Sequence, residues 1–295
     1  MKLYAYRGAE PNFGDELNHL VWPQLLPGIF DEDPTTLFLG IGSILFDGHP
    51  VNARKIVMGA GFGGYTNLPD VNDGSWQIHF VRGPQTASLL DIDPALALAD
   101  AGLLIRAVIS KPKHVPTKVS FMPHLSSVWR GNWQQACELA DMTFIDPRSD
   151  VNHILDQLLA SKVVIAEAMH GAIIADALRV PWIAALPLEN INRMKWLDWA
   201  QSLGIDYHPV PLRPSSLHEY KLTRLTTSRV ASKIASVVNE SRLSETARRI
   251  FCELAARRLI TIAKSAPSLS NDLRLDNMTD AMLSKVDVFR RSLFS

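Results

Sequence analysis

Short apolar runs alternate with amphipathic helical patterns along the first 210 residues of the chain. We predict strands at the apolar runs, namely Leu3–Tyr6, Leu37–Ile41, Ile56–Met58, Ile78–Val81, Ala95–Leu98, Leu104–Ile109, Val119–Met122, Met142–Ile145, Val163–Ala166, Trp182–Leu186 and Tyr207–Val210. Helices are predicted between them, for example Glu16–Leu26, Pro84–Leu90, Trp133–Leu139, Val151–Leu159, Ala172–Leu178 and Arg193–Leu203. Such alternation with nearly continuous apolar strands is typical of parallel sheets covered by helices on both faces.

The alternation is interrupted midway by a polar stretch, residues 111–118, which has the composition of a linker. We therefore predict an α/β fold with two Rossmann-like parallel-sheet domains, residues 1–117 and 118–214, facing each other across a cleft. Beyond residue 214 the strand patterns end, and residues 215–295 are predicted to form a C-terminal helical extension. Its helices are expected at Ser228–Asn239, Glu245–Lys264 and Thr279–Phe289.

The composition excludes several classes of protein. Among 295 residues, 30 Lys and Arg balance 30 Asp and Glu, so no net field attracts nucleic acid. The cysteines, Cys137 and Cys252, are too few for a disulfide framework and lack metal-ligand spacing. The sequence shows no secretory signal pattern and no apolar run of about 18 residues. We expect a cytoplasmic protein without a membrane span.

Basic residues gather in one predicted C-terminal helix, over Arg242–Lys264. A basic amphipathic helix of this kind is typical of contact with an anionic membrane surface. This indicates peripheral attachment at the inner face of the membrane; the alternative is a solvated face of a helix that bridges domains. The pattern makes no prediction about the oligomeric state.

The stretch around His170 carries the strongest candidate chemistry. The buried run Val163–Ala166 stops at Glu167, and a helical pattern begins immediately after the pair His170-Gly171. The helix amides then point out of the carboxyl edge of the sheet, where open α/β sheets bind ligands and helix starts attract anions. His170 beside Glu167 is therefore a candidate acid–base group, and Gly171 a candidate contact. The alternative is that His170 merely caps or packs the turn.

Glycine-rich turns follow three successive N-terminal strands, at Asn12–Asn18, Gly40–Ser43 and Gly59–Gly64. Because parallel strands end at one edge of a sheet, these turns leave room there for a ligand or for the opposing domain. Asp15 either caps the following helix or reaches into the cleft. The substrate contacts predicted in these turns are Asn12, Gly14, Ser43 and Gly61.

Arginine and histidine at other strand ends are predicted to complete a positive pocket. Arg82 precedes a helix that opens with Pro84, so we expect its guanidinium in the cleft, where it suits a phosphate or carboxylate. The alternative is an ion pair with Asp15 or with a carboxylate of the opposite half. His124 and Arg148 follow strands of the second half in the same way. The group describes a site for a small anionic molecule.

The order of these motifs resembles the polysaccharide pyruvyl transferase family over roughly residues 1–205. The family's N-x-G-D-E-L, G-x-G-S, glycine-turn, R-G-P-x-T and H-G-x-I-x-A-D-A-x-x-x-P elements are similar to Asn12–Asn18, Gly40–Ser43, Val57–Gly64, Arg82–Thr86 and Glu167–Pro181. Lys195–Trp199 is similar to a K-W-x-D-W element in the branch that makes succinoglycan-type exopolysaccharide.

The resemblance implies a two-domain fold of the GT-B glycosyltransferase type. It also implies transfer of pyruvate from phosphoenolpyruvate to a sugar of an exopolysaccharide, or of its lipid-linked precursor, as a ketal with release of phosphate. Phosphoenolpyruvate is then the donor substrate, and no cofactor is expected. Other branches carry S-x-R-x-H-G, but Ala168 stands at the arginine position here. Arg82 or Arg148 must then serve, or the donor is held differently.

For that reaction we assign His170 as the general acid, with Glu167 setting its protonation. Arg82 is expected to clamp the donor, and Asp15 to deprotonate a hydroxyl of the acceptor.

Two other kinds of protein compete with this hypothesis. A nucleotide-sugar glycosyltransferase or epimerase would use the same two-domain cleft. A non-catalytic member of a polysaccharide assembly would keep the fold, and Ala168 sustains that alternative. A metal enzyme or serine hydrolase is not expected, because H-E-x-x-H and G-x-S-x-G are both missing from the sequence.

Overall fold

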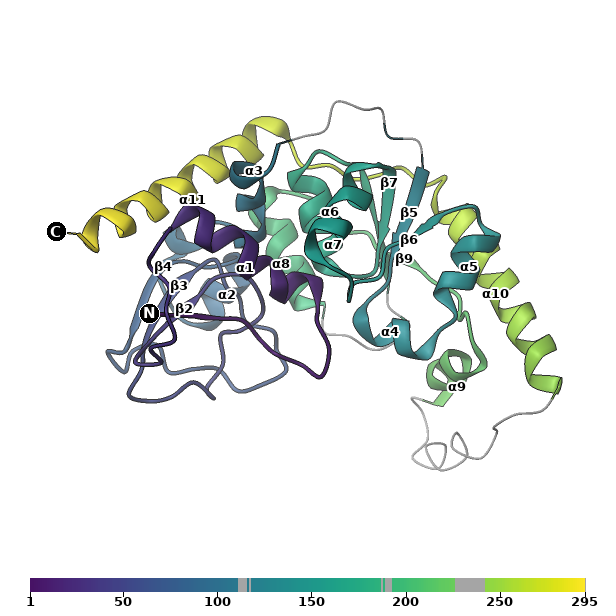
Figure 1. The fold of residues 1–295 in the computed structure, drawn as a ribbon, viewed down its shortest axis with the longest axis horizontal. Coiled ribbons are helices and arrows are strands. Elements are labelled where there is room, and N and C mark those ends of the chain that lie inside the picture. The colour runs from purple at the N-terminus through teal and green to yellow at the C-terminus, as the bar shows by residue number, and fades with distance from the viewer. Residues whose placement is uncertain (111–115, 117, 187, 189–192, 226–241, 295) are drawn as a thin grey trace.

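The structure is a computed structural model that describes residues 1–110, 116, 118–186, 188, 193–225 and 242–294 (Figure 1). Within these residues, the first sheet has the order β1-β2-β3-β4: β1 (Lys2–Tyr4), β2 (Thr36–Leu39), β3 (Arg54–Met58) and β4 (Trp76–Phe80). The second has the order β6-β5-β7-β8-β9: β5 (Lys118–Met122), β6 (Thr143–Phe144), β7 (Ser161–Ala166), β8 (Trp182–Leu186) and β9 (Val210–Pro211). Each pair of neighbouring strands is parallel, which confirms the predicted α/β class with two parallel sheets.

Helices follow most of the strands, but β2 connects to β3 and β3 to β4 without a helix. The helices are α1 (Phe13–Leu25), α2 (Pro84–Leu89), α3 (Ile105–Val108), α4 (Leu125–Arg130), α5 (Trp133–Leu139), α6 (Val151–Leu159), α7 (Met169–Ala177), α8 (Met194–Leu203), α9 (Leu217–Leu225), α10 (Arg242–Ile262) and α11 (Asp272–Ser292). Helix α6 shows why the pattern works: the Asp150 carboxylate accepts from the amides of Asn152 and His153, and the helix buries Ile154 and Leu158.

The second sheet is covered on both faces. Phe121 and Ile165 pack on the side of α5 and α10, whereas Met122, Val164 and Ala166 belong to the core that includes α6 and α7 (Figure 1). Alternate residues of a strand point to opposite faces, so two buried faces require apolar residues throughout. This accounts for the unbroken apolar run of β7.

The strand order of the second sheet reverses between β5 and β7. From β5 the chain passes to β6 on one side, and then returns to β7 on the other. In open α/β sheets a ligand site lies outside the carboxyl ends of the strands at such a switch point. His124 follows β5 and His170 follows β7, so the topology places both histidines at this position.

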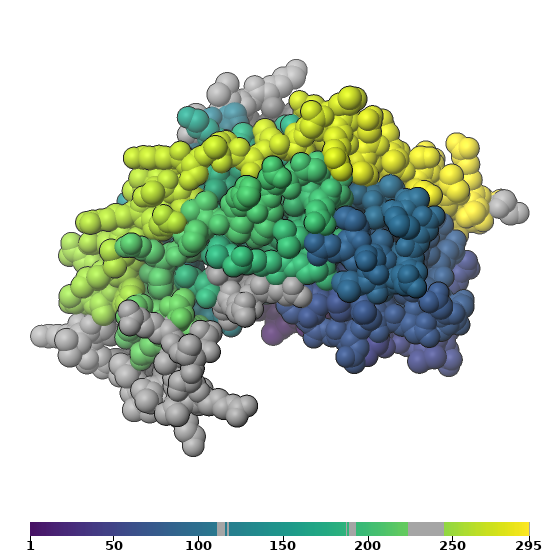
Figure 2. Space-filling model, turned by 180° about the vertical axis from the view of Figure 1, so that it is seen from behind, coloured from purple at the N-terminus to yellow at the C-terminus, as the bar shows by residue number. Residues whose placement is uncertain are grey.

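The C-terminal helices attach to both halves of the molecule. Helix α10 packs against α5 of the second sheet, while α11 lies over the first sheet. There the Phe289 ring meets the rings of Phe38 and His79, with centroids 6.1 and 5.1 Å apart. Figure 2 shows this segment crossing from one half to the other along the upper edge of the molecule. The predicted domain ranges stay a prediction, and the extension joins the two halves.

A single apolar core also runs between the sheets. It includes Phe38 and Ile56 of the first sheet, Val164 of the second, and Phe289 of α11. The short 3₁₀ helix η2 (Ala101–Leu104) packs against α7 within it. In the described part of the chain, no helix is both long and apolar enough to cross a membrane.

Three predicted strands were wrong or displaced. Ala95–Leu98 forms the 3₁₀ helix η1 (Pro94–Leu96), with one bridge from Ala97 to Val81. Leu104–Ile109 is the end of η2 followed by α3. In both places an aspartate side chain, Asp93 or Asp100, accepts from an amide two residues on and turns the backbone.

The third strand, predicted at Tyr207–Val210, begins only at Val210. The predicted helix Ser228–Asn239 and most of the predicted linker, residues 111–115 and 117, lie outside the described residues.

Candidate active site

A cleft of about 850 Å³ lies where the carboxyl ends of strands from both sheets meet. On the first side it is lined by the segment from Tyr6 to Asp15 and by the turns after β2 and β3. On the second side it is lined by the turns after β5 and β7 and by Lys195 of α8. Six predicted site residues line it: Asn12, Gly14, Asp15, Ser43, His124 and His170. The expectation that a ligand binds beyond the carboxyl ends of the parallel strands therefore located the cleft.

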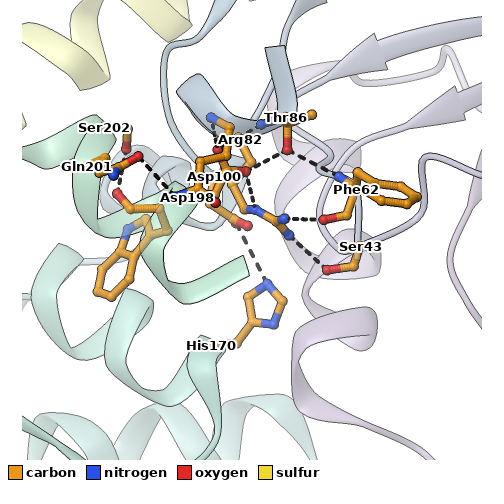
Figure 3. A network of polar contacts seen from close by, with 11 residues as sticks. Ser43, Phe62, Arg82, Thr86, Asp100, His170, Asp198, Gln201 and Ser202 are labelled. Carbon is orange, nitrogen blue, oxygen red and sulfur yellow. Dashed lines mark hydrogen bonds and ion pairs between the residues drawn. The ribbon is translucent and has the colours of Figure 1, made fainter. Parts of the chain in front are cut away.

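His170 lies at the start of α7 and faces a carboxylate that the sequence did not indicate. Its Nε2 is 3.7 Å from Oδ1 of Asp100, a fully buried residue at the start of η2 (Figure 3). Burial tends to raise the pKa of Asp100, but His170, Arg82 and the Gly102 amide outweigh it and hold that pKa below its ordinary value. Asp100 therefore stays ionised and presents a buried carboxylate to the His170 ring.

Gly14 makes this position of His170 sterically feasible. A Cβ atom at residue 14 would collide with Nδ1 of the His170 ring, so only glycine lets the imidazole lie against the start of α1. The ring is thus held between Asp100 and the first turn of α1. Helix α1 begins at Phe13, earlier than predicted, so Asp15 lies in its first turn and is not its cap.

Glu167 bonds to His124 and Ser127, whereas its predicted partner was His170. Its carboxylate is buried and accepts from the His124 amide at 2.8 Å and from Ser127 Oγ at 2.8 Å. Burial, only partly offset by these bonds, raises the pKa of Glu167 to about 7. Glu167 therefore fixes the turn that carries His124 and the start of α4.

His124 lines the cleft as a neutral group. Burial, with Lys195 and Arg130 nearby, lowers the pKa of His124 to about 4. Its Nδ1 lies 2.8 Å from Ser126 Oγ. The imidazole can donate or accept a hydrogen bond but carries no charge near pH 7, so the predicted positive pocket loses one of its cations.

Asp15 faces the cleft beside the start of α7. Asn12 Nδ2 donates to its Oδ2 at 2.6 Å. Burial raises the pKa of Asp15 above its ordinary value, against the opposing effects of Asn12, His170 and Lys195. A carboxylate with a raised pKa is a stronger base, which suits proton removal from a hydroxyl.

Arg82 does not project into the cleft, and the alternative of an ion pair across the two halves is correct. Its guanidinium is fully buried and donates to Asp198 Oδ2 at 3.0 Å, to Ser43 Oγ at 2.8 Å and to the Phe62 carbonyl at 2.6 Å (Figure 3). Gly61 belongs to this arrangement, because a Cβ there would collide with the guanidinium. Arg82 reaches the cleft only through Ser43.

The other two predicted contacts also lie outside the cleft lining. Arg148 bonds to Asp146 at 2.6 Å, pairs with Glu10 at 3.5 Å and stacks over the Trp129 ring. Gly171 faces the core, where an added Cβ would lie 2.7 Å from Met122 Sδ. Neither residue is part of the lining of the cleft beside His170.

Sequence reasoning missed Asp100 and gave no role to Lys195 or Asp198. The latter two belong to the K-W-x-D-W element at Lys195–Trp199, so a signal was present for them. For Asp100 there was none, because its neighbours formed an apolar run that was read as strands. In the part of the chain that is described, no group of three His, Cys, Asp or Glu side chains is placed to hold a metal ion.

Comparison with known proteins shows the family to which the chain belongs. A sequence model of the polysaccharide pyruvyl transferase family matches residues 33–186, over half of the chain. The chain is also 33% identical to the succinoglycan biosynthesis protein ExoV of Rhizobium meliloti (strain 1021), over 317 aligned residues that cover all of both proteins. No solved structure matches it. The chain belongs to the polysaccharide pyruvyl transferase family and is a polysaccharide pyruvyltransferase.

Proposed function

We propose that the enzyme transfers pyruvate from phosphoenolpyruvate to two hydroxyl groups of a saccharide, forming a ketal and releasing phosphate. One observation carries the proposal: the His170 imidazole, backed by the buried carboxylate of Asp100, lines a cleft beside the first residues of α1 and α7. Helix N-termini attract anions, and this donor carries a phosphate and a carboxylate. The imidazole supplies the proton that the reaction needs.

The first step is protonation of the donor's methylene carbon. His170 gives its proton to that carbon, which becomes the methyl group of the product, and the adjacent carbon becomes oxocarbenium-like. The ionised Asp100 lies beside the imidazole that gives up this proton, and a hydroxyl proton of the acceptor later replaces it. General acid catalysis of this kind contributes about 10²–10⁴ in rate.

Two attacks by the acceptor complete the ketal. One sugar hydroxyl adds to the activated carbon, the carbon–oxygen bond to phosphate breaks, and the second hydroxyl closes the ring. One hydroxyl proton ends on the methyl group and the other on phosphate, so no further reactant is required. Asp15 takes a hydroxyl proton, since its carboxylate lines the cleft and has a raised pKa.

A saccharide acceptor fits the rim of the cleft. Tyr6 and Tyr65 line it, and they expose 56% and 58% of their surface. Exposed aromatic rings offer flat apolar faces with a polar edge, which match the alternating C–H and hydroxyl groups of a sugar. The acceptor in this proposal is a sugar of an exopolysaccharide or of its lipid-linked precursor.

The cellular setting and the domain arrangement extend the proposal. We place the enzyme in the cytoplasm, in peripheral contact with the membrane that carries a lipid-linked acceptor, and we expect its two sheets to be arranged as in GT-B enzymes. Helix α10 supports membrane contact by exposing Arg249 and Arg257. Arg248 and Arg258 of the same helix instead bond to Gln135 and to the Pro211 carbonyl.

The test is phosphate release from phosphoenolpyruvate that depends on a saccharide acceptor. We expect one phosphate for each pyruvate that becomes acid-labile on the saccharide, with none released when the acceptor is omitted. Tight binding of a nucleotide sugar together with indifference to phosphoenolpyruvate would instead support a glycosyltransferase. Family membership favours pyruvyl transfer over that rival and over a non-catalytic role.

A further inference from the structure

Lys195 presents an unpaired ammonium group to the cleft. It is the second residue of α8, is half-buried, and lines the same cleft as His170. Its Nζ lies 5.7 Å from the centroid of the Tyr65 ring. Among the described residues, no carboxylate or carbonyl oxygen forms an ion pair or hydrogen bond with this ammonium. A desolvated cation in such a position needs an anion that the protein does not supply.

Lys55 is the matched comparison within the same molecule. Its ammonium also lies over an aromatic ring, 5.5 Å from the centroid of Trp76, and the residue is buried. Unlike Lys195, it donates to Ser75 Oγ at 2.9 Å and to the Val51 carbonyl at 3.3 Å. Lys55 therefore has the partners expected of a structural lysine. Within the described ranges, Lys195 contacts the ring but has no oxygen partner.

The electrostatic surroundings of Lys195 disfavour its charge. The charged and titratable groups that face it are Arg82 from the first half, Asp15 of α1, the Tyr65 hydroxyl and His124. Burial and then Arg82 lower the pKa of Lys195 to about 8, and Asp15 opposes them only in part. A cation at the start of a helix is also unfavourable, because the N-terminal end carries partial positive charge. The charge of Lys195 at this position therefore destabilises the folded protein when no ligand is bound.

We infer that Lys195 binds an anionic group of the donor, either the phosphate or the carboxylate of phosphoenolpyruvate. The inference rests on the proposed function. The lining supplied by Ala168 and Met169 in the turn before His170 carries no charge, and Arg82 is sealed behind Ser43. Tyr65 positions the ammonium, since its ring is in reach of a cation–π contact.

The test measures donor binding by calorimetry, with no acceptor present. Lys195→Met removes the charge at nearly constant length, and we expect the Kd for phosphoenolpyruvate to rise about 10- to 100-fold. Lys195→Arg should restore binding to within about fivefold of the wild type. The control is Lys264→Met, at an exposed lysine that follows α10, which should leave the Kd unchanged. Inorganic phosphate and pyruvate as separate probes show which group Lys195 holds.

Two readouts separate donor binding from a structural role. Removing an unpaired charge from the start of α8 should leave the Tm of Lys195→Met equal to or above that of the wild type. In the wild type, donor affinity should fall about tenfold per pH unit above pH 8, as Lys195 loses its proton. The donor is already fully ionised there, since the second pKa of a phosphate monoester is about 6. The fall should be missing in Lys195→Arg.

The outcomes distinguish this inference from the function on which it rests. If the wild type binds phosphoenolpyruvate and Lys195→Met binds it equally well, Lys195 is not its partner and the proposed function stands. If Lys195→Met loses affinity only together with Tm, its role is structural and the inference is rejected. If the wild type fails to bind phosphoenolpyruvate, phosphate and pyruvate, both conclusions are overturned.

Discussion

Two groups of charged residues lie between the halves of this enzyme, and they differ in how their polar atoms are satisfied. The first group, called the junction here, is the buried pair Arg82 and Asp198 between the two halves. Arg82 donates to three oxygens. The Asp198 carboxylate accepts from Arg82, from the amides of Gln85 and Thr86, and from Thr86 Oγ1 at 2.5 Å. At the cleft, His170 Nε2 and the Oδ2 of Asp100, which lies behind the cleft lining, are buried without a hydrogen-bond partner among the described residues.

The difference separates residues that stabilise the fold from residues that are available to a substrate. A buried charge whose bonds are all made within the protein holds two elements together and has nothing left to offer a ligand. Polar groups without partners are costly in a folded protein, and they persist where a substrate completes them. Arg82 and His170 gave the same signal in the sequence, a basic residue after a strand, yet they belong to opposite classes.

The largest effect is expected in the cleft. Replacing His170 with Ala removes the general acid, so we expect the acceptor-dependent release of phosphate to fall about 10²- to 10⁴-fold. The Tm should fall as well, because the fully buried Asp100 carboxylate loses the imidazole beside it, so the rates are compared at a temperature at which both proteins are folded. The measurement is the initial rate of phosphate release with phosphoenolpyruvate and acceptor both in excess.

The matched control for this variant is His208→Ala, at an exposed histidine outside the cleft lining. Its rate should equal that of the wild type. Near-normal transfer by His170→Ala would reject the imidazole as the acid and leave it a packing residue.

In the junction the expected effect is on stability. Asp198→Ala leaves the Arg82 guanidinium buried without its counter-ion and removes the acceptor for the first amides of α2. We expect the free energy of unfolding to fall by about 3–5 kcal/mol, measured by urea denaturation. Asp287→Ala breaks a half-exposed pair within α11 and should change it by less than about 1 kcal/mol. Equal effects at the two sites would show that burial of the pair is unimportant.

The sequence was sufficient for elements with strong local signals. Helices α5 and α6 begin and end at the predicted residues, since their apolar spacing is regular and Asp150 caps the second. The strand ends that form the cleft were also located, because the carboxyl edge of a parallel sheet follows from the order of elements. The helical structure at Leu104–Ile109 was not predicted, since a short apolar run fits a strand or a buried helix equally well.

Pairing between distant residues could not be predicted in the same way. Arg82 and Asp198 are 116 positions apart, and Asp100 meets His170 only because η2 packs against α7. Local patterns determine where a side chain leaves its strand. Its partner depends on how the two sheets pack, which no single segment encodes.

The smallest effect concerns the buried carboxylate of Glu167. Glu167 is held by a backbone amide and a hydroxyl, and burial raises its pKa to about 7 from 4.5. The folded protein therefore keeps this proton to higher pH than the unfolded chain, so stability from this group is greatest below pH 4.5 and declines up to pH 7.

The decline should amount to about 3 kcal/mol in the free energy of unfolding, at roughly 1.4 kcal/mol per pH unit. Glu167→Gln cannot ionise, so its stability relative to the wild type should increase by that amount between pH 4.5 and 7.5, as urea denaturation at each pH can measure. Glu253→Gln on α10, with no buried carboxylate involved, should show a constant difference. A constant difference for Glu167→Gln as well would mean that the carboxylate is ionised throughout, and that its bonds to His124 and Ser127 compensate for burial as fully as Arg82 does for Asp198.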